Sequence, residues 1–134
     1  MSTLFSRIVQ GEISSHRIAE NEEFYAFLDI NPTQMGHTLV IPKREEDYFF
    51  DLSADELGRL MAFAKAVAGA IRQAMGCQRV GLSVMGLEVP HAHLHLIPIN
   101  GMRDMYPENK TSPSADELAK VAERIRAFVP KELQ

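Results

Sequence analysis

Three histidines occur at every second position in the stretch VPHAHLHLIPI, residues 89–99. They are His91, His93 and His95, and the residues between them are apolar. In an extended strand, side chains two positions apart point to the same face and lie about 6.6 Å apart. The pattern therefore predicts a strand over 91–97 with three imidazoles on one face and apolar side chains entering the core on the other.

Two interpretations of this row involve no covalent chemistry. A surface strand with accidental histidines is disfavoured, because histidine has no special strand preference and three of the chain's five histidines stand here. A metal site is possible, since neutral imidazoles bind zinc. On a straight strand His91 and His95 would lie about 13 Å apart, so one ion would need a ligand from elsewhere, such as His37.

The third interpretation is nucleophilic catalysis. Imidazole has a pKa of about 6.5 and can form a covalent bond to phosphorus or to a carbonyl carbon, which water then breaks. Its second ring nitrogen must be held by an acceptor, and nearby donors must bear the charge that develops on the reacting group. The middle histidine, His93, has such neighbours on both sides.

The elements that would position these histidines follow from hydrophobic periodicity and turn signals. Strands are predicted over 17–20, 24–28, 37–42, 79–85 and 91–97. Strands and helices do not alternate through the first half of the chain. The fold class predicted is therefore α+β, with an antiparallel sheet of about five strands and two main helices against one face.

The helices are predicted from capping residues and from apolar stripes. A short helix begins after Thr3 and stops at Gly11, and a last helix begins after Ser114. The long helix over 53–75 begins with a capping box of Ser53 and Glu56. Its predicted apolar stripe consists of Leu57, Leu60, Met61, Ala64, Val67, Ala68, Ile71 and Met75.

Length and charge narrow the class of protein. A chain of 134 residues suits a single domain spanning 1–134, and a net charge of -4 argues against a nucleic-acid partner. No apolar run is long enough to span a membrane, and the N-terminus lacks the apolar segment of a signal peptide. We therefore expect a soluble cytoplasmic protein without a membrane partner. A local positive site could still bind a small anion.

The stretch HAHLHLI resembles the signature of the histidine triad family, which is His-φ-His-φ-His-φ-φ with φ apolar. Two further blocks are similar to the family. LFSRIVQGEI, residues 4–13, resembles its N-terminal helix, and FLDINPTQMGHTLVIPK, residues 27–43, resembles its Gly-His-x-Leu-Val-Ile-Pro-Lys segment. The blocks occur in the family's order and cover most of residues 4–98. Residues 99–134, a loop and the C-terminal helix, show no match.

The resemblance implies a phosphoramidase-like nucleotidyl hydrolase or transferase that acts on purine nucleotides without a cofactor or a bound metal. The α-phosphate linkage would be cleaved through a covalent nucleotidyl-histidine intermediate. The nucleophile would be His93, held by the backbone carbonyl of His91. His95 would face the phosphate, and His37 matches the fourth family histidine. A homodimer with joined sheets is also implied. The alternatives are a nucleotide-binding module with little turnover and a zinc-binding protein that uses the same histidines.

The nucleotide-binding residues implied by the resemblance lie outside the triad. Asp29 would bind the ribose hydroxyls, although an Asp before Pro32 is also typical of a turn. The residues that would enclose the base are Leu4, Phe5, Ile8, Ile30 and Leu39.

The segment before the triad departs from the family pattern. Many members carry a hydroxyl residue there that assists the leaving group, where this chain has Glu88. Glu88 and its neighbour Val89 are also expected to contact the nucleotide. If the chain bends at Pro90, a protonated Glu88 could donate a proton to the leaving group. Without a bend it would be a solvated carboxylate. The Cys-x-x-Cys of zinc-binding members matches Leu4 to Arg7, so that zinc site is not expected.

Overall fold

The computed structural model of the chain describes residues 2–134. Its helices are α1 (Leu4–Val9), α2 (Ala54–Met75) and α3 (Ala115–Arg126). Its strands are β1 (Arg17–Glu20), β2 (Phe24–Leu28), β3 (Thr38–Pro42), β4 (Arg79–Ser83) and β5 (Leu94–Ile99). Four short 3₁₀ helices complete the chain, namely η1 (Phe49–Asp51), η2 (Met102–Met105), η3 (Pro107–Asn109) and η4 (Lys131–Leu133).

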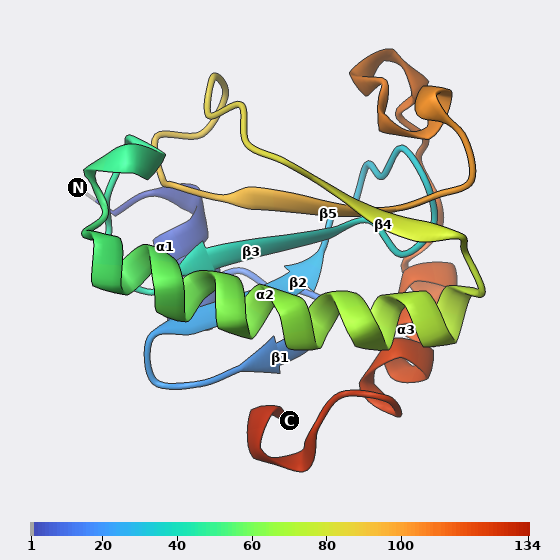
Figure 1. The fold of residues 1–134 in the computed structure, drawn as a ribbon, viewed down its shortest axis with the longest axis horizontal. Coiled ribbons are helices and arrows are strands. Elements are labelled where there is room, and N and C mark those ends of the chain that lie inside the picture. The colour runs from blue at the N-terminus through green and yellow to red at the C-terminus, as the bar shows by residue number, and fades with distance from the viewer. Residues whose placement is uncertain (1) are drawn as a thin grey trace.

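The five strands form one antiparallel sheet in the order β1-β2-β3-β5-β4 (Figure 1). Two main helices accompany it, which confirms the predicted α+β class. The central pairing joins β3 to β5, with Leu39 opposite His95. This pairing brings the two segments richest in candidate residues side by side, although they are far apart in the sequence.

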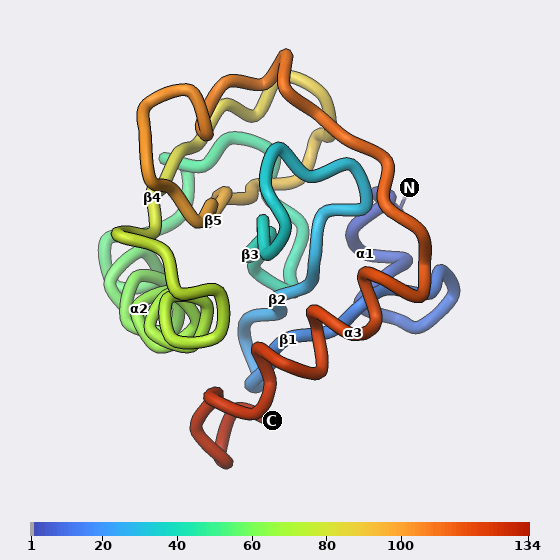
Figure 2. Tube along the Cα trace, turned by 90° about the vertical axis from the view of Figure 1, so that its right-hand side faces the viewer, coloured from blue at the N-terminus to red at the C-terminus, as the bar shows by residue number. Residues whose placement is uncertain are grey.

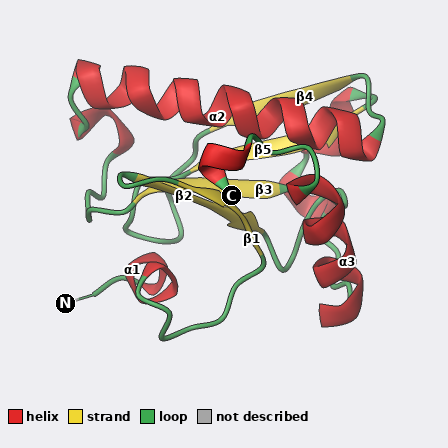
Figure 3. Cartoon of the chain, turned by 90° about the horizontal axis from the view of Figure 1, so that it is seen from below, coloured by secondary structure: helices red, strands yellow, loops and turns green. Residues whose placement is uncertain are grey.

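The two faces of the sheet bury different clusters. Alternation along β3 sends Val40 into the large core beneath α2 and α3, while Leu39 and Ile41 enter a smaller cluster on the opposite face. The short helix α1 covers that second face, and α2 lies on the other side of the sheet (Figure 3). The candidate site is therefore built on the thinly covered face.

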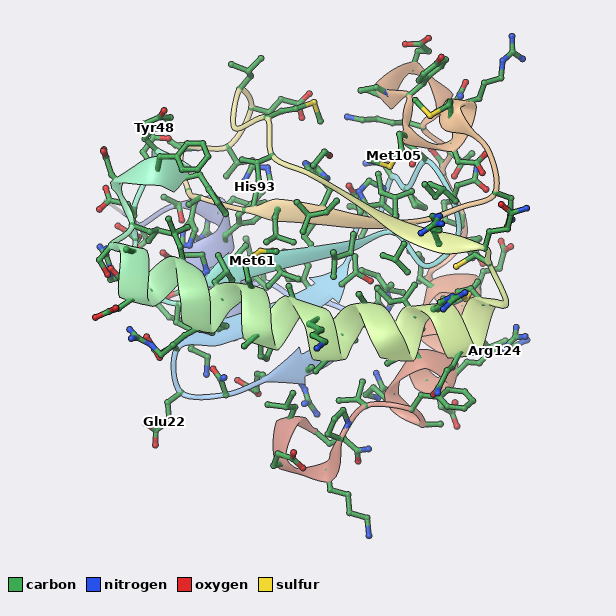
Figure 4. The ribbon with its side chains drawn as sticks, in the orientation of Figure 1. Glu22, Tyr48, Met61, His93, Met105 and Arg124 are labelled. Carbon is green, nitrogen blue, oxygen red and sulfur yellow. The ribbon has the colours of Figure 1, made fainter. Side chains whose placement is uncertain are left out.

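The capping boxes predicted for the two main helices are present. Ser53 with Glu56 opens α2, and Ser114 with Glu117 opens α3. The predicted stripe of α2 is wrong at Met61, which is labelled in Figure 4 and is 47% exposed. The buried face of α2 consists of Leu60, Phe63, Ala64, Val67, Ala70, Ile71 and Ala74.

The histidine strand begins later than predicted, at Leu94 rather than His91. Before that point the backbone bonds elsewhere, because the Ala92 amide donates to the carbonyl of Glu46 at 2.6 Å. The first two triad histidines therefore lie before the strand, in a segment that leads from a bend into β5. The preceding strand is also shorter than predicted, since β4 ends at Ser83. Across residues 2–134, no helix is both long and apolar enough to cross a membrane.

Candidate active site

His91 is fully buried and its ring is held at both nitrogens. Nε2 lies 2.8 Å from the backbone carbonyl of Pro42, and Nδ1 lies 2.7 Å from the hydroxyl of Thr3. A carbonyl can only accept, so Nε2 carries the proton and Nδ1 accepts from the Thr3 hydroxyl. Burial lowers the pKa of His91, which favours this neutral form. Both ring nitrogens of His91 are thus committed to the fold.

Thr3 belongs to a polar network that fastens α1 to this histidine. It is the N-cap of α1, and its hydroxyl accepts from the Ser6 amide at 3.0 Å. The Glu45 carboxylate accepts from the Ser6 hydroxyl at 2.5 Å and from the Thr3 amide at 3.0 Å. These two hydrogen bonds, with Ser6 first, hold the pKa of Glu45 below its usual range. Ser6 and Glu45 were not predicted as site residues, because a polar residue type does not indicate a hydrogen-bond partner so distant in the chain.

The ring of His93 is oriented by the backbone of His91. Its Nδ1 lies 2.7 Å from the His91 carbonyl, so Nδ1 carries the proton and donates. The other nitrogen, Nε2, therefore keeps its lone pair. The ring of Phe5 meets both imidazoles edge-on, with centroid distances of 5.1 Å to His93 and 5.8 Å to His91. His93 is thus a buried imidazole in the tautomer that a nucleophile requires.

His37 fixes the tautomer of His95 in the same way. Its Nδ1 accepts from the backbone amide of Thr33 at 3.2 Å, so its proton is on Nε2. That Nε2 lies 2.9 Å from Nδ1 of His95, which must accept. Nε2 of His95 therefore carries a proton and is a donor. The ring centroids of His93 and His95 lie 5.2 Å apart, so the two imidazoles are neighbours.

Burial keeps the rings of His95 and His37 neutral. It is the largest cause that lowers the pKa of His95 to about 4, with further lowering by the neighbouring rings of His37 and His93. Burial also lowers the pKa of His37, against the opposing effect of the Asp29 carboxylate. The charge of Lys110 lowers the pKa of both rings. Near neutral pH the rings of His37 and His95 are consequently neutral.

Asp29 makes the turn that its sequence context suggested and also lies beside the histidines. One carboxylate oxygen, Oδ1, accepts from the amide of Asn31 at 2.8 Å. The other, Oδ2, lies 3.7 Å from Nε2 of His37, which is beyond hydrogen-bond distance. The side chain is partly exposed, so Oδ2 can still accept from a ligand.

The predicted apolar nucleotide-binding residues fall into two groups. Phe5, Leu39, Ile8 and Val89 belong to one apolar cluster on the α1 face, which also contains Tyr25, Phe27, Val9 and Ile41. Leu4 and Ile30 are exposed, by 47% and 61% respectively. A planar apolar ligand could therefore contact the exposed pair and the edge of the cluster, while Phe5 itself is largely a core residue.

Glu88 lies on the bend that leads into the triad and points toward solvent. The chain bends over residues 87–91, and the Glu88 side chain is 81% exposed. Its carboxylate lies 3.7 Å from the ammonium of Lys110. Sequence analysis did not find Lys110, since it stands in a loop beyond the matching blocks. Glu88 is therefore half of an ion pair at the edge of the site.

Within residues 2–134, one group of His, Cys, Asp and Glu side chains has the geometry to hold a metal ion. It consists of Asp29, His37 and His95, whose donor atoms all lie within 4.8 Å of one another. This is not the ligand set suggested by the triad alone. His91 uses both nitrogens elsewhere, and Nδ1 of His93 donates to a carbonyl. Two imidazoles and a carboxylate suit zinc, but an ion would have to displace the proton shared by His37 and His95.

The fold and the site together define an α+β protein with a row of hydrogen-bonded imidazoles on one face of its sheet. A family model described as the HIT domain matches residues 10–102. The chain therefore belongs to the HIT domain family, as the triad predicted.

Relatives and solved structures agree with this assignment. An uncharacterised HIT-like protein of Mycoplasma genitalium is 38% identical over 83% of this chain and 84% of its own length. The adenosine 5′-monophosphoramidase of Saccharomyces cerevisiae is 36% identical over 71% of this chain and 61% of its own. A crystal structure of a Hit-like protein involved in cell-cycle regulation from Bartonella henselae superimposes with a TM-score of 0.84, at 28% identity and 96% coverage of both chains. A hypothetical histidine triad nucleotide-binding protein from Sulfolobus tokodaii gives 0.82, at 27% identity over 92% of this chain and 89% of its own.

The lowered pKa of His95 predicts how stability depends on pH. Its pKa is about 4 in the folded protein and 6.5 in its ordinary state. Between those values the unfolded chain carries the proton and the folded protein does not, so lowering the pH favours unfolding. We expect the free energy of unfolding to fall from pH 7 to pH 4.5, and to fall less steeply in His95→Asn, which keeps an acceptor for His37. Urea titrations in the presence of a chelator would measure both slopes. Parallel curves for the two proteins would contradict the assignment.

Proposed function

We propose that the protein is a nucleotidyl hydrolase or transferase that cleaves a nucleoside α-phosphate linkage, a phosphoramidate or a related one, through a covalent bond to His93. The observation that carries the proposal is the 2.7 Å hydrogen bond from Nδ1 of His93 to the His91 carbonyl, which leaves Nε2 free to attack. Membership of the HIT domain family and the phosphoramidase among its relatives support the same reaction.

The proposed reaction has two steps. In the first, Nε2 of His93 forms a bond to the α-phosphorus while the bond from phosphorus to the leaving group breaks, and an amine leaving group takes up one proton. In the second, water breaks the bond between phosphorus and His93 and releases one proton. The positive charge on the substituted ring is stabilised by its Nδ1–H bond to the His91 carbonyl, and Nε2–H of His95 donates to a phosphate oxygen.

A zinc-binding protein is the second candidate, because Asp29, His37 and His95 could hold an ion. The two proposals make different demands on His93, which is not in that group. Metal analysis of protein purified without chelator would separate them. Stoichiometric zinc that is lost in His37→Asn would favour the metal site.

His93→Asn should abolish the covalent intermediate. Asn has no nucleophilic nitrogen, whereas Asp29 and the apolar cluster remain to bind the nucleotide. The measurement is mass spectrometry of acid-quenched protein after mixing with adenosine phosphoramidate. We expect a nucleotidyl adduct that maps to His93 in the wild type and no adduct in the variant. His16→Asn, which changes a histidine outside the site, serves as the matched control. Near wild-type turnover by His93→Asn would disprove the assignment.

Asp29 should determine recognition of the ribose. Asp29→Asn keeps an oxygen for the Asn31 amide but removes the charge that two ribose hydroxyls would share. Since a charge-assisted hydrogen bond contributes about 1.5–3 kcal/mol, we expect AMP to bind at least about tenfold more weakly. 2′,3′-Dideoxy-AMP should lose much less affinity. Calorimetry with both nucleotides tests this, and equal losses would indicate a purely structural Asp29.

We further propose that the protein is a homodimer joined at β4. This strand is the edge of the sheet, and its outer side has no partner strand in the described part of the chain. Leu82 lies opposite Leu96, a core residue beneath α2, so both point to the α2 face. Leu82 is nevertheless 44% exposed, as Met61 of α2 is by 47%. An exposed strand edge flanked by apolar side chains is a surface that a second copy could cover.

Charges placed on that surface should separate the subunits. We expect a dimer in sedimentation at micromolar concentration for the wild type, and a monomer for the double change Met61→Glu and Leu82→Glu, because a dimer would have to bury two unpaired carboxylates from each subunit. Phe128→Glu is the control, since Phe128 is 48% exposed just after α3, which packs on β1 at the opposite edge of the sheet. A wild-type protein that stays monomeric would contradict the proposal.

A further inference from the structure

The segment between β5 and α3 folds back over the candidate site. The amide and the hydroxyl of Thr111 both donate to the carbonyl of Pro32, at 2.9 and 2.7 Å. Pro32 stands in the loop between β2 and β3, which also holds Asp29 and Thr33. Figure 2 shows this orange segment passing the loop on its way to α3. Residues 107–111 are thereby held against the loop that would bind the nucleotide.

Lys110 is the residue that this anchor places at the site. Its ammonium lies 3.7 Å from the carboxylate of Glu88, which belongs to the loop before β5. The pair thus joins the two segments that flank β5, and the start of that strand carries His95. The lysine is also within electrostatic range of the donor histidines, because its charge lowers the pKa of both His37 and His95.

The pair itself is weak, and this leaves the lysine available. A separation of 3.7 Å exceeds hydrogen-bond distance, and the side chains of Lys110 and Glu88 are 46% and 81% exposed. Exposed ion pairs of this kind contribute little to stability. An ammonium held in place but not committed to a partner can exchange Glu88 for a better anion.

We propose that Lys110 is a specificity-determining residue that binds an anionic group on the leaving-group side of the substrate. The proposal rests on the function proposed above. In that function the apolar residues hold the base, Asp29 holds the ribose, and His93 and His95 face the α-phosphate. The rest of the substrate would then extend toward solvent, and the exposed Lys110–Glu88 pair is the charged group nearest to that path in the proposal. A second phosphoryl group is the chemistry that suits an ammonium there, so the substrate class is a nucleotide with a phosphorylated leaving group.

Binding of AMP and ADP to His93→Asn protein tests the proposal without consuming the ligands. Adding Lys110→Met keeps the length of the side chain and removes its charge. We expect ADP to lose about tenfold more affinity than AMP, the effect of one charge-assisted contact. Lys110→Arg should keep the preference for ADP. Glu88→Gln should strengthen ADP binding, because it removes the competing carboxylate. Lys120→Met, at an exposed position on α3, is the matched control.

The outcomes separate this inference from the proposed function. Unchanged affinities for AMP and for ADP in the Lys110→Met protein would overturn the role of Lys110 alone. Equal losses for AMP and ADP would also overturn it, since the lysine would then act on the α-phosphate or on the fold. If neither nucleotide binds to His93→Asn or to wild-type protein, the proposed function fails, and the inference fails with it.

Discussion

The hydrogen bond from Nδ1 of His93 to the carbonyl of His91 is the constraint on which the site depends. A carbonyl cannot donate, so this contact alone places the proton and leaves Nε2 bare. The carbonyl can orient the His93 ring because contacts of the His91 side chain fix its position. Its ring is clamped between Thr3 and Pro42, and its side chain is fully buried. A histidine that touches no substrate in the proposed reaction therefore prepares the one that does.

The same contacts also hold the short helix α1 in place. A helix as short as α1 has little stability of its own, because helix nucleation is unfavourable, and it must be held by tertiary contacts. Apolar packing by Phe5 supplies part of what is needed, and the Thr3, Ser6 and Glu45 network supplies a polar part. The apolar packing and the polar network also contact the histidines. Phe5 meets the rings of His91 and His93 edge-on, and the Thr3 hydroxyl is hydrogen-bonded to His91. The same contacts consequently attach α1 to the sheet and orient His93, the proposed nucleophile.

The charge of the candidate site differs from the net charge of the whole chain. The protein is acidic, with a net charge of -4, yet its candidate site offers neutral imidazoles and a nearby ammonium. Burial lowers the pKa of His37, His91 and His95, so these three rings are uncharged near neutral pH. The C-terminal segment, which matches no family block, contributes the cation through its anchor on Pro32. In the proposed reaction, chemistry and discrimination between substrates thus come from different parts of the chain.

The sequence by itself determined the α+β class, the two capping boxes, the alternation along β3 and the row of histidines, because these follow from local rules of period and capping. Local rules did not predict that β5 starts at Leu94 or that Met61 is exposed. Both depend on which other segments form backbone hydrogen bonds or pack in the core nearby. Only the tertiary structure decided the tautomers. Thr3 meets His91 across 88 residues and His37 meets His95 across 58, and a ring nitrogen's role is set by which donor or acceptor the fold brings to it.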